Sequence, residues 1–86
     1  MDFSDLSRPP AFVRGARPDA ETASRIILIK RVSVLRATYQ VRLLALKAAE
    51  TGKSLILQVP PTCRFDASLQ ELIGLRPSLI RREDLG

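Results

Sequence analysis

The 86-residue chain has no histidine, a single cysteine and few acidic residues outside its ends. The missing histidines remove the commonest zinc ligand and the usual general base. One cysteine, Cys63, cannot form an intramolecular disulfide, and we expect it to be a small structural residue; a regulatory thiol beside Arg64 is the alternative. The acidic residues of the middle segment are Glu50, Asp66 and Glu71, and two of these are better explained as capping residues than as an acid–base pair. We therefore expect no enzyme, no metal site and no cofactor.

Long hydrophobic runs are also missing. The longest aliphatic run, residues 26–29, is far shorter than the roughly 18 residues that a membrane span needs. The N-terminal sequence MDFSDLSRPPAF lacks the basic start and apolar core of a secretory signal. These absences predict a soluble, cytoplasmic protein with no membrane span, and a lone thiol fits a reducing compartment.

The composition is that of a small folded protein with a basic middle segment. Hydrophobic residues make up 45% and charged residues 27%, which argues against wholesale disorder. A chain of 86 residues is one domain at most and has a thin stability margin, so self-association is the remaining source of support. The net charge is +5, and a basic body can meet nucleic acid, an anionic membrane surface or an acidic protein.

Three segments are predicted. Residues 1–24 contain prolines and little periodicity, so we expect an extended, partly mobile arm that its apolar residues, Phe3, Leu6, Phe12 and Val13, could pin to a surface. Residues 25–76 should form the domain, and residues 77–86 a polar C-terminal tail. No internal repeat is visible.

The order of elements predicted within the domain is β-α-β-α. Residues 25–34 are rich in Ile and Val, which favours a strand; one long helix over residues 19–50 is the competing interpretation. Residues 35–52 predict a helix with Ser33 as a plausible N-cap and Gly52 as its stop. A β-α-β passage of this kind makes the two strands parallel.

The second half of the domain follows from turn and capping residues. Ser54 to Val59 reads as a buried strand that Pro60 and Pro61 end. Asp66 or Ser68 can then cap a short helix that stops at Gly74. The predicted fold class is a small α/β domain with a parallel strand pair and an extended N-terminal arm.

Gly52-Lys53-Ser54 resembles the end of a phosphate-binding loop, but its context is wrong. Such a loop needs a glycine five residues before its second glycine, where this chain has Lys47. It must also follow a strand and open a helix, whereas this string closes a helix and opens a strand. We therefore interpret it as a helix stop.

The predicted helix carries two apolar stripes on roughly opposite sides. One stripe, at heptad spacing, consists of Val34, Ala37, Val41, Leu44 and Ala48. The other consists of Leu35, Tyr39, Leu43 and Leu46. One stripe is enough to cover a sheet, so the second predicts an interface with another copy or another protein, unless the arm and the C-terminal helix cover it. The chain is thus predicted to be a non-enzymatic protein–protein interaction or regulatory module, and a homodimer.

A small nucleic-acid-binding protein is the alternative function. The phosphate contacts would come from Arg25, Lys30, Arg31, Arg36 and Arg42. A strand followed by a helix is typical of ribbon-helix-helix repressors, but residues 25–33 do not alternate and the second helix of that fold is replaced by an apolar strand. The aromatics that could stack on bases are few, namely Phe3, Phe12, Tyr39 and Phe65.

Residues 46–75, LKAAETGKSLILQVPPTCRFDASLQELIGL, resemble the closing third of STAS domains, the fold of anti-sigma-factor antagonists. The shared pattern is a helix ending in Gly, a hydrophobic strand, a turn, and a short helix leading into Gly74-Leu75. The family's Asp-Ser-Ser-Gly type phosphorylation motif is absent, because this chain has SVLRATY before the helix. Ser33 aligns loosely with the serine that is phosphorylated in that family. It lacks the acidic and glycine neighbours of that serine, so the role is not carried over. The resemblance implies a compact α/β module that works by protein contact.

Overall fold

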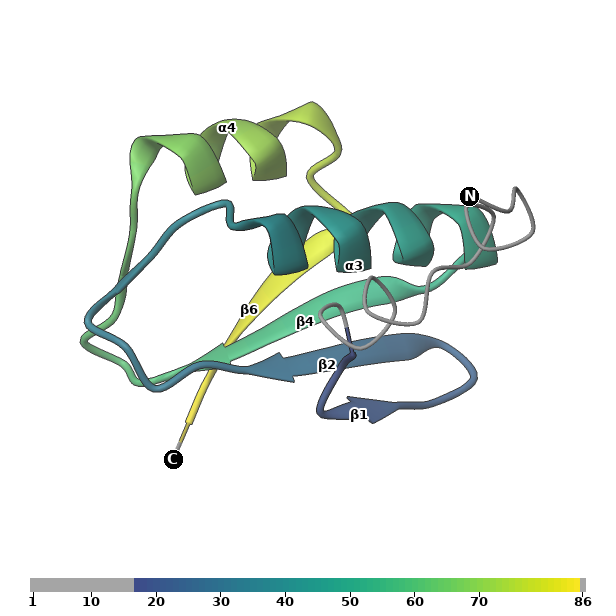
Figure 1. The fold of residues 1–86 in the computed structure, drawn as a ribbon, viewed down its shortest axis with the longest axis horizontal. Coiled ribbons are helices and arrows are strands. Elements are labelled where there is room, and N and C mark those ends of the chain that lie inside the picture. The colour runs from purple at the N-terminus through teal and green to yellow at the C-terminus, as the bar shows by residue number, and fades with distance from the viewer. Residues whose placement is uncertain (1–16, 86) are drawn as a thin grey trace, which may run out of the picture.

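A computed structural model of the chain describes residues 17–85. In this part of the chain, an initial hairpin is followed by strands and two helices that form an α/β domain (Figure 1). Their bounds are β1 Ala20–Glu21, β2 Arg25–Ile29, β3 Val34–Leu35, α3 Tyr39–Thr51, β4 Ser54–Val59, β5 Arg64–Phe65, α4 Ala67–Leu75 and β6 Ile80–Asp84.

The main sheet has the strand order β1-β2-β4-β6. β1 is antiparallel to β2, whereas β2, β4 and β6 are parallel to one another. Because the chain moves in one direction across the sheet, two crossovers of the same hand place α3 and α4 on the same face, as Figure 1 shows. The predicted fold class, an α/β domain with a parallel strand pair, is confirmed.

β2 is a strand, so the long helix over residues 19–50 is wrong. Burial alternates along β2, with Ile26 and Leu28 buried beneath the helices and Arg25 and Ile29 exposed. The strand ends at Ile29 rather than at residue 34. Residues 34–35 belong instead to β3, which pairs in parallel with β5 in a separate two-stranded sheet.

α3 begins four residues later than the sequence predicted. Its N-cap is Thr38, whose Oγ1 accepts a hydrogen bond from the Val41 amide at 3.2 Å, so the prediction of Ser33 as cap is wrong. The stop at Gly52 is confirmed: this residue is left-handed, with φ 70°, and its amide donates to the carbonyl of Ala48.

The domain continues beyond residue 76, so the polar tail over residues 77–86 is a wrong prediction. Asp66 caps α4 by accepting from the Leu69 amide, and the helix runs past Gly74 to Leu75. The chain then returns as β6, which adds to the edge of β4. Only Ile80 of this strand is buried, so its mostly polar sequence does not show the apolar pattern of a strand.

The N-terminal arm falls partly outside the described residues. Residues 1–16, with all four apolar residues expected to anchor the arm, are not described. Within residues 17–24 the structure has β1, and the Asp19 carboxylate accepts a hydrogen bond from the Ile29 amide at 2.7 Å. These residues therefore close one edge of the sheet.

The core lies between the sheet and the two helices. The largest fully buried side chains come from β2, α3, β4 and α4: Ile26, Leu28, Val41, Leu44, Leu55, Leu57, Val59 and Leu69. No polar or charged side chain of the described residues is buried. The first predicted stripe of the helix supplies this core through Val41, Leu44 and Ala48.

Candidate interaction surfaces

The side of α3 that points away from the sheet is apolar at its centre. At 100° per residue, Tyr39, Leu43 and Leu46 lie on the side opposite Val41 and Ala48, the buried side of the helix. Tyr39 is 60% exposed, Leu46 is 54% exposed and Leu43 is half-buried. We call these three residues the outer face of α3.

Leu35 does not belong to this face. The sequence placed it in the same stripe because it is four residues before Tyr39, but it lies in β3, where it is buried in the core. The candidate interface is therefore shorter by one residue than the sequence predicted.

An acidic residue of β1 ties the N-terminal hairpin to α3. The Glu21 carboxylate pairs with Lys53 Nζ at 2.5 Å and with Lys47 Nζ at 3.0 Å. The hydrogen bonds from Lys53 and then from Lys47 lower the pKa of Glu21 below its usual value. Both lysines are thus committed to an ion-pair network on the side of α3 next to β1.

The loop after β4 is held by one arginine of β6. The Arg82 guanidinium donates to the carbonyls of Cys63 at 2.8 Å, Pro61 at 3.0 Å and Pro60 at 3.1 Å. Its Nε donates to the Asp84 carboxylate at 2.9 Å. The guanidinium carbon also lies 5.1 Å from the centre of the Phe65 ring. This set of contacts positions the loop from which β5 and α4 start.

A second set of contacts joins the N-terminus of α4 to the segment before α3. The Ser68 hydroxyl donates to the Asp66 carboxylate at 2.6 Å and accepts from the Ala37 amide at 3.0 Å. The hydrogen bond from Ser68, followed by that from the Leu69 amide, lowers the pKa of Asp66. Asp66 therefore caps α4, which is one of the two capping alternatives that the sequence left open.

The five basic residues proposed to contact phosphates come from both ends of β2, from the segment before α3 and from α3 itself. Arg25 begins β2, whereas Lys30 and Arg31 follow the opposite end of that strand. Arg36 precedes α3, and Arg42 lies on α3, where its Nε donates to the Ala37 carbonyl at 3.0 Å. The Phe65 ring is stacked by Arg82. Arg25 is therefore separated from Lys30 and Arg31 by the length of β2.

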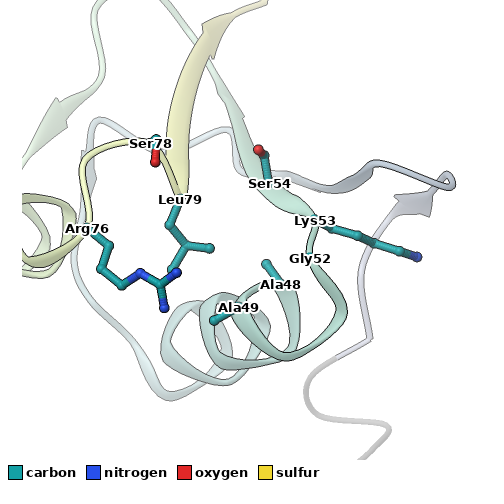
Figure 2. A pocket seen from close by; sticks show the side chains of 8 residues that line it. All are labelled: Ala48, Ala49, Gly52, Lys53, Ser54, Arg76, Ser78 and Leu79. Atoms are coloured by element: carbon teal, nitrogen blue, oxygen red, sulfur yellow. The ribbon is translucent and has the colours of Figure 1, made fainter.

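A hollow of about 220 Å³ lies where α3 and α4 end, next to the first residues of β4. Gly52, Lys53 and Ser54 are among its lining residues (Figure 2). Figure 2 shows Arg76 extending toward the hollow and Lys53 pointing away from it. Both helices present their C-terminal, electronegative ends here, which is the wrong polarity for a phosphate.

Cys63 is buried at 3% exposure in the loop held by Arg82. Its thiol lies 3.7 Å from the Arg64 carbonyl. A thiol in this position packs as a small apolar residue. The burial of Cys63 therefore supports its interpretation as a small structural residue.

The face of the main sheet opposite the helices has an apolar centre. Ile27 is half-buried, Ile29 is 37% exposed, and Ile56, between Ile27 and Arg81 in the strand register, is buried. Parallel strands are normally covered on both faces. Among residues 17–85, no helix lies on this side of the sheet.

Comparisons with protein-family models, with curated proteins and with solved structures found no match for the chain. Neither helix within residues 17–85 is long and apolar enough to cross a membrane. In the same part of the chain, no group of three or more His, Cys, Asp or Glu side chains is placed to hold a metal ion.

Proposed function

We propose that the protein is a small, non-enzymatic interaction module that self-associates through the outer face of α3. The observation that carries the proposal is Leu46, a large aliphatic side chain that is 54% exposed in the middle of a helix whose inner side is fully packed. Exposed leucines are common singly, but Leu46 is continuous with Leu43 and Tyr39 on one side of the helix.

The charges around Leu46 favour a second copy as the partner. Two α3 helices that pack antiparallel about a twofold axis at Leu46 place residues equidistant from it opposite one another. Arg42 then faces Glu50 of the second copy, and the same pair repeats on the other side of the axis. Arg42 and Glu50 are both exposed, and α3, with 13 residues, is about 20 Å long, which accommodates both pairs.

Substitution of Leu46 by glutamate tests this contact. Leu46→Glu places a charge at the centre of the interface, and we expect it to lower the mass of the protein measured by light scattering after size exclusion. The matched control is Leu75→Glu, the same change at a leucine of α4 that is 77% exposed and lies off the outer face of α3. Equal masses for Leu46→Glu and the wild type would contradict the proposal.

Salt dependence distinguishes this function from nucleic-acid binding. Phosphate contacts weaken steeply between roughly 50 and 200 mM salt, because counterions are released on binding. Association through leucines responds little to the same change. A monomer that copurifies with nucleic acid and releases it in salt would replace the self-association proposal with the nucleic-acid alternative.

The STAS-like resemblance of residues 46–75 stays a prediction. In this segment α3 ends at Gly52 and is followed by β4, the two-residue β5 and α4. A compact module that works by protein contact is the function that the resemblance implies, and this agrees with the proposal.

A further inference from the structure

The two edges of the main sheet differ in how much unpaired backbone they present. At one edge, β1 has only two residues. Beyond them, the Ile29 amide of β2 donates a hydrogen bond to the Asp19 carboxylate. At the other edge, β6 has five residues, of which Arg81 to Asp84 are exposed. β6 is therefore the longer open edge of the described sheet.

The register of β6 shows which of its backbone groups point outward. The Leu55 amide donates to the Leu79 carbonyl, and the Leu85 amide donates to the Val59 carbonyl. Because the backbone groups of successive residues point to alternate sides of a strand, the amides and carbonyls of the odd-numbered residues of β6 face β4. Those of Ile80, Arg82 and Asp84 face outward, and no backbone hydrogen bond joins their amides to another described residue.

Two side chains of β6 lie on the helix-free face of the sheet, Arg81 and Glu83, because Arg82 between them is paired with the core residue Leu57. Arg81 is exposed and makes no hydrogen bond or ion pair with another described residue. Glu83 accepts from Gln58 at one carboxylate oxygen, at 2.6 Å, which leaves its other oxygen available.

We propose that β6 pairs antiparallel with β6 of a second copy, so that Arg81 of each chain faces Glu83 of the other. Antiparallel pairing requires outward-facing residues to oppose one another, which allows a twofold axis through Arg82. Ile80 then opposes Asp84, and roughly six backbone hydrogen bonds form. Arg81 and Glu83 fall in the closely spaced pairs without hydrogen bonds, where opposite charges attract most effectively.

The axis also brings the two Arg82 residues opposite one another on the helix side. Each of these guanidinium groups is held toward its own loop by three carbonyls and is paired with its own Asp84, so the like charges are locally compensated. The result is one continuous sheet of two copies in which neither β6 edge is open. This contact is separate from the outer face of α3 and does not depend on it.

Charge reversal in the Leu46→Glu background isolates the β6 contact from the α3 contact. We expect Leu46→Glu to remain a dimer of about 19 kDa, twice the 9.5 kDa chain, at low salt. Adding Arg81→Glu or Glu83→Arg should each give a monomer, because like charges then face one another. Combining both reversals should restore the dimer, since the pair is rebuilt with its signs exchanged.

Cysteine cross-linking tests the register independently, in a Cys63→Ala background. Arg81→Cys and Glu83→Cys proteins, mixed and oxidised, should form a mixed disulfide, because these positions oppose one another. A Glu83→Cys homodimer forming equally fast would overturn the register. A monomeric Leu46→Glu protein, or a dimer that neither charge reversal disrupts, would overturn the β6 contact. These outcomes are distinct from failure of the α3 contact, which is seen when Leu46→Glu has the mass of the wild type.

Discussion

Arg82 is expected to be the charged residue whose loss destabilises the domain most. Its guanidinium makes hydrogen bonds to three loop carbonyls, at 2.8, 3.0 and 3.1 Å. Charged hydrogen bonds contribute about 1.5 to 3 kcal/mol each when buried, but the Arg82 side chain is 32% exposed, and water can replace part of what is lost. The pair with Asp84, which is 57% exposed, adds at most about 1 kcal/mol. We therefore expect Arg82→Ala to cost about 2 to 3 kcal/mol in total, because the contributions are not additive.

Arg82→Lys separates the effect of the several guanidinium N–H donors from the effect of the positive charge. A lysine keeps the positive charge but cannot present several donors in one plane to the three carbonyls, so we expect it to lose about 2 kcal/mol. For a domain of this size, about 1 kcal/mol corresponds to roughly 4 to 8 °C in Tm. Arg82→Ala should then lower Tm by roughly 10 to 20 °C. Urea and thermal unfolding followed by circular dichroism, at one low protein concentration, measure these differences.

The control for this series is Arg31→Ala. Arg31 is an exposed arginine that makes no hydrogen bond or ion pair with another described residue, so its loss should change stability by no more than about 0.5 kcal/mol. If Arg82→Lys were as stable as Arg31→Ala, the fork of hydrogen bonds would not be what holds the loop.

Three further predictions concern caps, glycines and pH. Gly52→Ala should lower the free energy of unfolding by about 1 kcal/mol, because alanine is strained at the positive φ of 70°. Gly74→Ala, in a helix with open space around the new Cβ, should leave that free energy unchanged or raise it. Equal effects of the two substitutions in urea unfolding would contradict this. Thr38→Ala should cost about 1 kcal/mol, Thr38→Ser little and Ser33→Ala nothing measurable, and a larger loss for Ser33→Ala would refute the assignment of the cap. The pKa of Glu21 is lowered in the folded state. The stability that Glu21 contributes is therefore present above the unfolded-state pKa and is lost as the pH falls through the folded-state pKa. The Tm advantage of the wild type over Glu21→Gln should thus be full at about pH 7 and vanish well below about pH 4; an advantage independent of pH would sink the ion-pair explanation.

The parts of the fold that local chemistry determines could be predicted from the sequence. β4, SLILQV, is a mostly apolar segment that follows Lys53 and precedes Pro60, and the sequence predicted both of its ends correctly. β6 could not be predicted, because its charged sequence has one buried residue, Ile80, and the strand exists only through pairing with β4. Pairing between residues far apart in the chain leaves little local signal.

The candidate interface shows the same division. Helical periodicity correctly grouped Tyr39, Leu43 and Leu46 on one side of α3, because residues three and four apart share a face. It failed at Leu35, since the apolar residues before the helix continue its spacing although the helix begins only after Thr38. The contacts of Arg82 with loop carbonyls have no sequence signature at all.

The measurement that tests the central claim most directly is the mass of the wild-type protein by light scattering across a wide range of concentration. Self-association predicts a mass that rises above the 9.5 kDa of one chain as concentration increases, in nucleic-acid-free protein and at both low and high salt. A mass that stays at that of one chain at every concentration would contradict self-association through either surface.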